Sequence, residues 1–163
     1  MLQLAWLGFG LVIAVASLFA YRSRRALMIG RVALAALYLV AGAAVNTVFL
    51  VRGDDYAAFA DGSYIPFVRE TWRAVVAPNH MIFIPLLILF EATVGVLLLV
   101  GGRWAQLGLV SAIGFHVALV TFGWGYYLWS IPMILAMLLL LRAQRRSAPT
   151  PKDSPRQVVS AAR

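Results

Sequence analysis

The sequence predicts an all-α, polytopic membrane protein, and three observations support this fold class. Hydrophobic side chains make up 63% of the 163 residues, whereas charged side chains make up only 12%, about half the share found in soluble domains. The apolar residues form runs of about 20, the length that a helix needs to cross a bilayer. Basic residues cluster beside these runs, as topology signals do. The net charge of +8 is therefore attributed to membrane topology, and no nucleic-acid partner is expected.

Two regions are expected along the chain. A transmembrane domain covers residues 1–141, and a disordered basic tail rich in Pro and Ser covers residues 142–163. In the segment YRSRR the positive charge follows the first apolar run. A cleaved signal peptide carries its charge before the run, so the first run is interpreted as a retained anchor. The predicted spans are 2–20, 31–51, 81–100, 104–122 and 125–141.

The positions of the arginines predict the orientation. The segments placed inside carry most of the basic residues, whereas the loop 52–80 carries few. The positive-inside rule then puts the N-terminus outside and the C-terminus in the cytoplasm. The richness in Ala, Gly, Val and Arg favours a bacterial protein, and hence the plasma (inner) membrane. The arginines placed inside, besides those of the tail, are Arg22, Arg24, Arg25, Arg31 and Arg103.

The outer loop, residues 52–80, contains a helical pattern in YIPFVRETWRAVVAPN. Its apolar residues recur at helical spacing, and Pro66 suits the first turn of a helix. We expect a short helix lying in the outer membrane interface. This helix is either a lid over a site or a segment that only rests on lipid. The apolar positions are Ile65, Val68, Trp72, Val75 and Val76.

Polar side chains inside the spans indicate a candidate site. They are Asn46, Glu91 and His116, with His80 at the outer rim. A rise of about 1.5 Å per residue places Glu91 roughly 13 Å, His116 roughly 18 Å and Asn46 roughly 21 Å above the inner ends of their helices. An ionisable group within a span is a candidate functional residue. We therefore expect these four residues to bind a ligand in an outward-opening pocket between the second, third and fourth spans.

Small residues predict which helix faces pack together. On the fourth span, Gly108, Ala112 and His116 follow one another at intervals of four, a pattern that lets a neighbouring helix approach closely. On the second span, Gly42 lies one turn before Asn46. On the third span, Gly95 lies one turn after the carboxylate. The polar residues therefore share the faces expected to point inward.

Each polar residue also has a purely structural interpretation. Glu91 can be a protonated carboxyl that donates a hydrogen bond to a neighbouring helix. His116 can be a neutral histidine bonded to a backbone carbonyl or to Glu91. Asn46 can link two helices, and His80 can belong to a helix start. These alternatives stay open.

Metal and haem sites are not expected. The chain has no cysteine, which excludes disulfides and iron–sulfur clusters. His80 lies roughly 16 Å along the axis from Glu91, too far to share a metal. The two histidines differ in depth by about 12 Å, which disfavours a bis-histidine haem. No cofactor of its own is therefore predicted, and a quinone is the candidate for an exchangeable one.

Two stretches resemble the DoxX-like family of small bacterial membrane proteins. GRVALAALYLVAGAAVN has an Arg at its start and a Gly before a polar residue. FEATVGVLLLVGGRWAQLGL has a mid-helix Glu, then a Gly, an aliphatic run, a Gly turn and an Arg. Glu91, Gly95, Gly101 and Arg103 match motif positions of the family. The resemblance covers about residues 30–141 and implies a four-helix bundle, to which the first span and the tail are additions.

The resemblance implies a limited range of functions. Some members are associated with quinone-linked sulfur oxidation, as a subunit of thiosulfate:quinone oxidoreductase, and others with membrane complexes for oxidative-stress resistance. The leading hypothesis is a protein that binds a small hydrophobic ligand, quinone or lipid-like, as a subunit of a redox complex; whether it is itself an enzyme stays open. The alternatives are a non-enzymatic scaffold or accessory subunit and, third, a small transporter or proton-conducting bundle. Expected partners are the lipid bilayer and other complex subunits or further copies of the chain.

Overall fold

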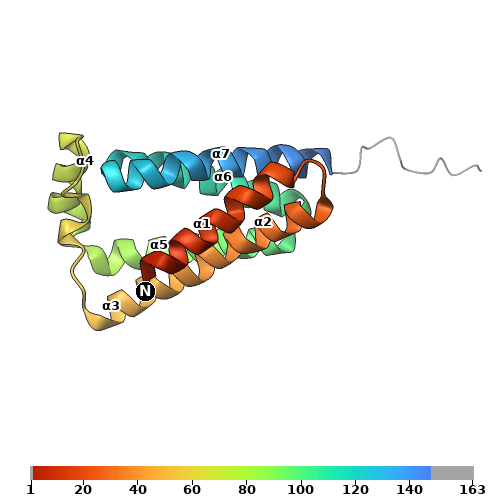
Figure 1. Cartoon of the computed structure of the whole chain (residues 1–163). Coiled ribbons are helices and arrows are strands. Elements are labelled where there is room, and N and C mark those ends of the chain that lie inside the picture. Colours follow the sequence, from red (N-terminus) through yellow and green to blue (C-terminus); the bar gives the residue numbers. More distant parts are fainter. Residues whose placement is uncertain (1, 148–163) are drawn as a thin grey trace, which may run out of the picture.

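The computed structural model describes residues 2–147, and the regular structure over this range is entirely helical (Figure 1). π-helical segments, in which each hydrogen bond spans five residues, cover Leu37–Ala44 and Trp72–Val76. Short 3₁₀ turns cover Ala57–Ala60 and Val120–Phe122. The α-helices are α1 (Leu2–Phe19), α2 (Arg24–Ala36), α3 (Val45–Arg52), α4 (Pro66–Thr71), α5 (His80–Val100), α6 (Gly102–Leu119) and α7 (Trp124–Arg146).

Within the described residues, four helical stretches are long and apolar enough to cross a membrane. α2, the first π-helical segment and α3 form one continuous stretch, and α5, α6 with its terminal 3₁₀ turn, and α7 form the others. The N-terminal α1 is a shorter apolar helix, with its apolar part at Trp6–Phe19, so its predicted crossing of the membrane stays a prediction. The four stretches are Arg24–Arg52, His80–Val100, Gly102–Phe122 and Trp124–Arg146.

Two helices extend beyond the predicted spans, whose limits in a membrane stay predictions. The helix that contains the second span begins at Arg24, because Ser23 caps it and the Ser23 hydroxyl accepts a hydrogen bond from the amide of Ala26 at 3.2 Å. The helix that contains the last span continues to Arg146. The first residues of the predicted tail are therefore helical. The prediction of disorder for the rest of the tail concerns residues 148–163, which lie outside the described residues.

The helices pack side by side with a core of aliphatic and small side chains. α1 and α2 form a hairpin, and α1 also packs against α7 (Figure 1). Gly95 brings α5 against the end of α2 and the π-helical segment after it, since a Cβ atom there would stand 2.5 Å from Leu39 Cγ and 3.3 Å from the carbonyl oxygen of Ala35. Gly108 does the same between α6 and α5, where a Cβ atom would lie 3.2 Å from the side chains of Leu97 and Leu98. These glycines let α5 pack closely against both neighbouring helices, α2 and α6.

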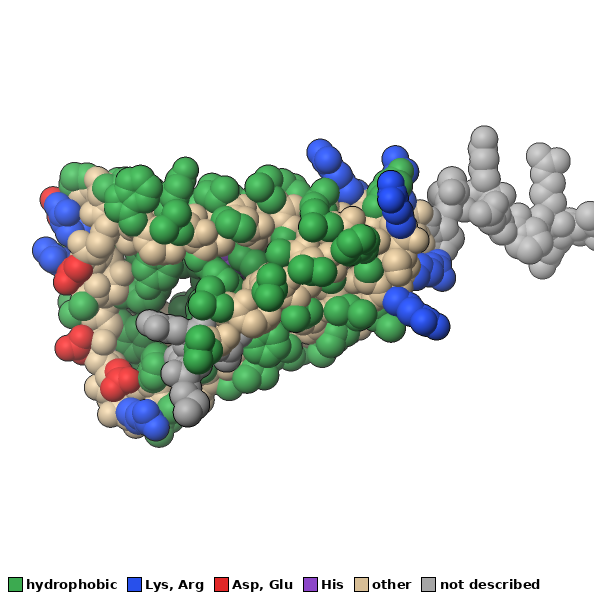
Figure 2. Space-filling model, in the orientation of Figure 1, with side chains coloured by type: hydrophobic (Ala, Val, Ile, Leu, Met, Phe, Trp, Pro, Cys, Tyr) green, Lys and Arg blue, Asp and Glu red, His purple; other side chains and the backbone are tan. Residues whose placement is uncertain are grey.

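The loop between α3 and α5 covers one end of the bundle, and α4 lies across that end (Figure 1). The sequence prediction of a short helix in this loop is confirmed, with Pro66 in its first turn. Its depth in a membrane interface stays a prediction. Figure 2 shows that the acidic side chains gather at this loop end, whereas the opposite end carries arginines. Among the described acidic residues, only Glu91 lies inside the bundle.

Candidate functional site

Asn46 and Glu91 meet inside the bundle. Asn46 follows the π-helical segment in the first turn of α3, and its side-chain amide donates a hydrogen bond to Glu91 Oε2 at 2.9 Å. The Glu91 side chain, in the middle of α5, is buried. An ionised carboxylate has about four lone-pair sites, and Asn46 occupies one. Glu91 therefore retains hydrogen-bonding capacity for another group.

The backbone around Gly42 makes room for this pair. Gly42 lies in the π-helical segment Leu37–Ala44, and its missing side chain leaves the space that the Glu91 carboxyl group occupies. π-helical turns inside α-helices are frequent at functional sites. Tyr38 and Asn46 are eight residues apart, a spacing that keeps both side chains on one side of the helix.

A cavity of about 640 Å³ lies beside the pair, beneath the loop. Its volume falls in the range of about 300–1,000 Å³ that is usual for small-molecule sites. Asn46 and Glu91 are part of its wall, together with Asp54 and Asp55 near the loop. Most other lining residues are apolar or aromatic. The aromatic lining residues are Trp6, Phe49, Tyr56, Phe59, Trp72, Phe115 and Tyr126.

An aromatic cluster closes the loop end of the cavity. Phe59 and Trp72 of the loop stack with ring centroids 4.9 Å apart. Phe122, between α6 and α7, packs at 5.3 Å from Phe59 and 5.4 Å from Trp72. Tyr126 of α7 lies 5.2 Å from Phe59. Contacts between aromatic rings, stacked or edge-to-face, thus attach the loop to the bundle.

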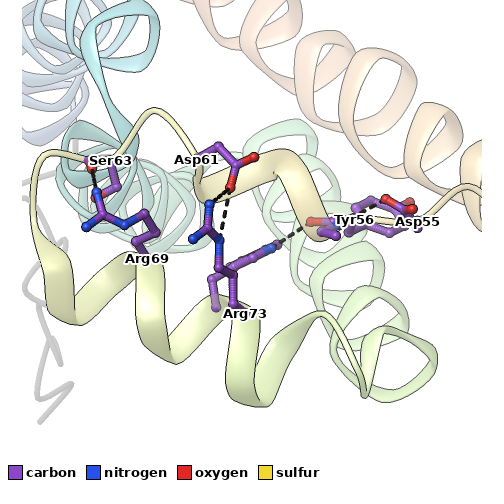
Figure 3. A network of polar contacts seen from close by, with 8 residues as sticks. Asp55, Tyr56, Asp61, Ser63, Arg69 and Arg73 are labelled. Atoms are coloured by element: carbon purple, nitrogen blue, oxygen red, sulfur yellow. Dashed lines mark hydrogen bonds and ion pairs between the residues drawn. The ribbon is translucent and has the colours of Figure 1, made fainter.

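Hydrogen bonds hold the loop in this position (Figure 3). The Trp72 indole donates to the carbonyl of Tyr56 at 2.7 Å. Arg73 pairs with Asp61 at 2.6 Å. The buried hydroxyl of Ser63 donates to the carbonyl of Thr121 at 2.7 Å, which ties the loop to the turn between α6 and α7. The loop is therefore bonded to the end of the bundle as a cap, and its contact with lipid stays a prediction.

Tyr56 connects the cap to the polar pair. Its hydroxyl donates to the backbone carbonyl of Asn46 at 3.3 Å. Burial first, and then the nearby carboxyl groups of Asp54 and Glu91, raise the pKa of Tyr56 above its ordinary value. The hydroxyl therefore stays protonated near neutral pH and can act as a donor. Position and protonation together make Tyr56 part of the site.

Trp6 brings α1 into the site. Its ring packs on Trp129 of α7, with centroids 5.8 Å apart, and it lines the large cavity. The Trp6 Nε1 atom is buried and has no hydrogen-bond partner among the described residues. Buried indole N–H groups usually find a partner. This donor is therefore available to an acceptor on a molecule in the cavity.

His116 bonds to Tyr38 rather than to Glu91. Its Nδ1 lies 3.0 Å from the carbonyl of Ala112, on the preceding turn of α6, and 3.2 Å from the Tyr38 hydroxyl. A carbonyl can only accept, so Nδ1 carries the hydrogen and Nε2 is the acceptor nitrogen. His116 and Glu91 both line a second, smaller cavity of about 30 Å³. The two side chains are thus neighbours across a gap.

His80 lies apart from the other predicted site residues. Its Nδ1 contacts the carbonyl of Ala77 at 2.9 Å, and its ring lies 6.2 Å from the ring of Tyr56. Neither the large nor the small cavity is lined by His80. In the described part of the chain, no group of three or more His, Cys, Asp or Glu side chains is placed to hold a metal ion. The polar centre of the site is formed by Asn46, Glu91 and, across the small cavity, His116.

Figure 2 shows an opening in the side of the molecule near the loop end, and the described side chains beside it are mainly hydrophobic. It lies close to the start of α1 and below α7 in the orientation of Figure 1. These helices supply Trp6 and Tyr126 to the wall of the large cavity. A ligand could therefore enter from the side of the bundle, between α1 and α7.

Sequence reasoning missed Trp6, Tyr38 and Tyr56 as site residues. Tyr38 stands in the apolar run LYLVAG, where a tyrosine resembles a packing residue. Trp6 reaches the site only because α1 folds back against α7. For Tyr56 a signal was present, since an aromatic residue directly follows the acidic pair of the loop.

No family model, no curated protein and no solved structure matches the chain. The function is therefore argued from the geometry of the site alone.

Proposed function

We propose that this chain is a DoxX-like membrane protein that binds a small, largely apolar ligand with a polar head group, quinone or lipid-like, in the cavity beneath the loop. The observation that carries the proposal is the Asn46–Glu91 pair in the wall of a cavity that is otherwise lined mainly by aromatic and aliphatic side chains. Ligand sites typically combine an apolar lining with a few polar groups that orient the ligand. A polar pair that served packing alone would not need an adjoining cavity of about 640 Å³.

The polar groups suggest how a head group would be held. Glu91 can accept a hydrogen bond from a ligand hydroxyl, because Asn46 uses only part of its capacity. The unpaired Trp6 Nε1–H can donate to a carbonyl. A quinone and its quinol suit this combination, because the carbonyl oxygens of the quinone can accept from Trp6 and the hydroxyl groups of the quinol can donate to Glu91. The aromatic walls suit stacking against such a ring.

A proton path can be part of this function. Glu91 and His116 line the small cavity of about 30 Å³, and a water molecule needs roughly 10–15 Å³. A water there could link the carboxyl group to the acceptor nitrogen of His116. The pair would then exchange the two protons of the quinone–quinol couple with the ligand, one after the other, while a partner subunit would supply or take up the two electrons. This step is proposed as a consequence of ligand binding and depends on it.

The proposed orientation in the membrane is based on the distribution of the arginines along the chain. The charge asymmetry favours the loop end outside and the arginine-rich end in the cytoplasm of a bacterial inner membrane. In that placement the cavity lies in the outer half of the bilayer, and its side opening faces the acyl chains. A hydrophobic ligand could then enter from the lipid phase without crossing water.

The test is a binding titration of the purified full-length chain with a short-chain benzoquinone. Tryptophan fluorescence is the readout, because Trp6 and Trp72 line the cavity and a bound quinone quenches nearby indoles. Saturable quenching is expected in the wild type. Glu91→Leu should weaken binding by about tenfold, the effect of losing one charged or strong hydrogen bond. Glu70→Gln, which changes an exposed acidic residue of α4 outside the cavity, should leave binding unchanged.

A second measurement identifies a natural ligand. Mass spectrometry of an organic extract of the wild-type protein should show a molecule at a stoichiometry near one per chain, reduced in Glu91→Leu and retained in Glu70→Gln. Non-saturable quenching together with no extracted molecule would refute the ligand site. The same result with intact folding would favour the scaffold interpretation.

A further inference from the structure

Another cavity, separate from the large and the small cavity of the candidate site, lies at the arginine-rich end of the bundle, opposite the loop. It has a volume of about 450 Å³ and is formed by the starts of α2 and α6 and the end of α7. Four arginines contribute to its wall, with two glutamines and a serine, and no Asp or Glu is among its lining residues. The polar lining residues are Arg24, Arg25, Arg31, Arg103, Gln106, Gln144 and Ser147.

Arg31 is the most firmly held of these arginines. Its Nε donates to the carbonyl of Leu98 at 3.0 Å, and one terminal nitrogen donates to Gln144 Oε1 at 3.2 Å. Its guanidinium group also lies against Gly101, where a Cβ atom would stand 3.1 Å away. A guanidinium has five N–H donors, so further donors remain. Arg31 is therefore held in place while part of its donor capacity stays unused.

The cavity concentrates positive charge without acidic neighbours. Within residues 2–147, none of its four arginines forms an ion pair with Asp or Glu. Like charges at such close quarters repel each other, and a bound anion would relieve this repulsion. α6 starts at Gly102 in the wall of the cavity. The free amides of the first turn of this 18-residue helix add further donors for an anion.

The surroundings of the cavity indicate which anion fits. Leu27 and Met28 line it beside the arginines, and Met28 is exposed on the flank of α2. Trp104, next to Arg103 on α6, is also exposed. The cavity thus joins a cationic end to apolar helix sides. A phosphate group linked to acyl chains meets the same change from charge to hydrocarbon in a bilayer.

We propose that the cavity formed by Arg24, Arg25, Arg31 and Arg103 binds a phosphate group, namely that of an anionic phospholipid. Planar guanidinium groups bind phosphate oxygens with paired hydrogen bonds. This site is separate from the cavity beneath the loop and does not depend on the function proposed for that cavity. It would fix the position of the arginine-rich end relative to the lipid head groups.

The test compares lipids on the purified full-length chain by native mass spectrometry. Phosphatidylglycerol and phosphatidylcholine with identical acyl chains share the phosphodiester, but only phosphatidylglycerol has a net charge. The wild type should retain phosphatidylglycerol in about tenfold preference, the range of one charge-assisted contact. Arg103→Gln and Arg24→Gln should each reduce this retention by about the same factor. These two are preferred to changes at Arg31, whose hydrogen bonds also hold the helices together.

Arg22→Gln is the matched control, because Arg22 is an exposed arginine at the same end that does not line the cavity. It should change the retention by less than twofold. An equal loss in Arg22→Gln and Arg103→Gln would overturn the proposal, since it would show only diffuse attraction between charges. Equal retention of the two lipids would overturn it as well.

Inorganic phosphate distinguishes the two sources of the phosphate group. Thermal unfolding of the delipidated wild type is measured with phosphate and with chloride at equal ionic strength. With a lipid site, stabilisation by phosphate should be small compared with that by phosphatidylglycerol. Strong stabilisation by phosphate that is lost in Arg103→Gln, without retained lipid, would assign the cavity to a free phosphate and overturn the lipid assignment.

Discussion

The backbone of Gly42 lies directly against the carboxyl group of Glu91, so closely that a Cβ atom at position 42 would stand 2.7 Å from Oε1 and 2.8 Å from Cδ. The position of the carboxyl group therefore depends on a residue without a side chain on the facing helix. Since Glu91 also accepts the hydrogen bond of Asn46, a change at Gly42 should reach both members of the pair.

Gly42→Ala should displace Glu91 and lengthen its hydrogen bond to Asn46. The carboxyl group is the far end of a flexible side chain beside the cavity, so it can move, and the main cost is the hydrogen bond to Asn46, about 0.5–1.5 kcal/mol. This cost offsets the gain of about 1 kcal/mol that alanine brings to a helix. A melting temperature below that of the control variant and weaker quinone binding are expected in detergent. Gly114→Ala is the control, because a Cβ atom there meets nothing within 4 Å. A Gly42→Ala protein as stable as Gly114→Ala would show that the two helices yield freely at this point.

Tyr38→Phe should remove one buried hydrogen bond and keep the ring packing. The hydroxyl contacts His116 Nδ1 at 3.2 Å and the carbonyl of Ala112 at 3.4 Å. Its loss should lower the free energy of unfolding by about 1 kcal/mol. The melting temperature is compared with that of Tyr127→Phe, which alters an exposed tyrosine of α7. Equal melting temperatures for the two variants would mean that the Tyr38 hydroxyl contributes nothing to stability.

The four helical stretches that are long and apolar enough to cross a membrane could be predicted from the sequence, because long apolar runs separated by charge and glycine leave few other solutions. The start of α2 could not be placed by hydropathy, since Arg24 and Arg25 precede the apolar run, although Ser23 was a capping signal. In the site, Asn46 and Glu91 could be brought together by estimating depth along each helix. The partner of His116 could not, because Tyr38 stands in an apolar run and resembles a packing residue.

Ser63→Ala should loosen the loop more than Asp61→Asn. The buried Ser63 hydroxyl donates to Thr121 and accepts from the amide of Ile65 at 3.2 Å, so its removal leaves two backbone groups unpaired, at a cost of about 1–3 kcal/mol. Asp61 forms an exposed ion pair with Arg73, and exposed pairs contribute roughly 0–1 kcal/mol. Amide hydrogen exchange over residues 55–76 measures the difference. Faster exchange in Asp61→Asn than in Ser63→Ala would contradict the assignment of Ser63 as the main attachment.

Gly10→Ala should separate α1 from α7 and open the large cavity. A Cβ atom at position 10 would stand 2.6 Å from the ring of Trp129, which is held by Trp6 and cannot move away freely. Gly8→Ala, two residues earlier on the same helix, meets nothing within 4 Å and has the same helix-forming effect. The comparison therefore isolates the contact between α1 and α7.

Gly10→Ala should raise the hydrogen-exchange rate of α1 by about tenfold or more, which corresponds to about 1.4 kcal/mol of lost local stability. The dissociation rate of a bound quinone should rise with it, because the side opening lies beside the start of α1. Stopped-flow tryptophan fluorescence measures that rate. If exchange on α1 accelerates while quinone dissociation stays at the Gly8→Ala value, the ligand leaves by another route, and the entrance between α1 and α7 is refuted although the cavity itself stands.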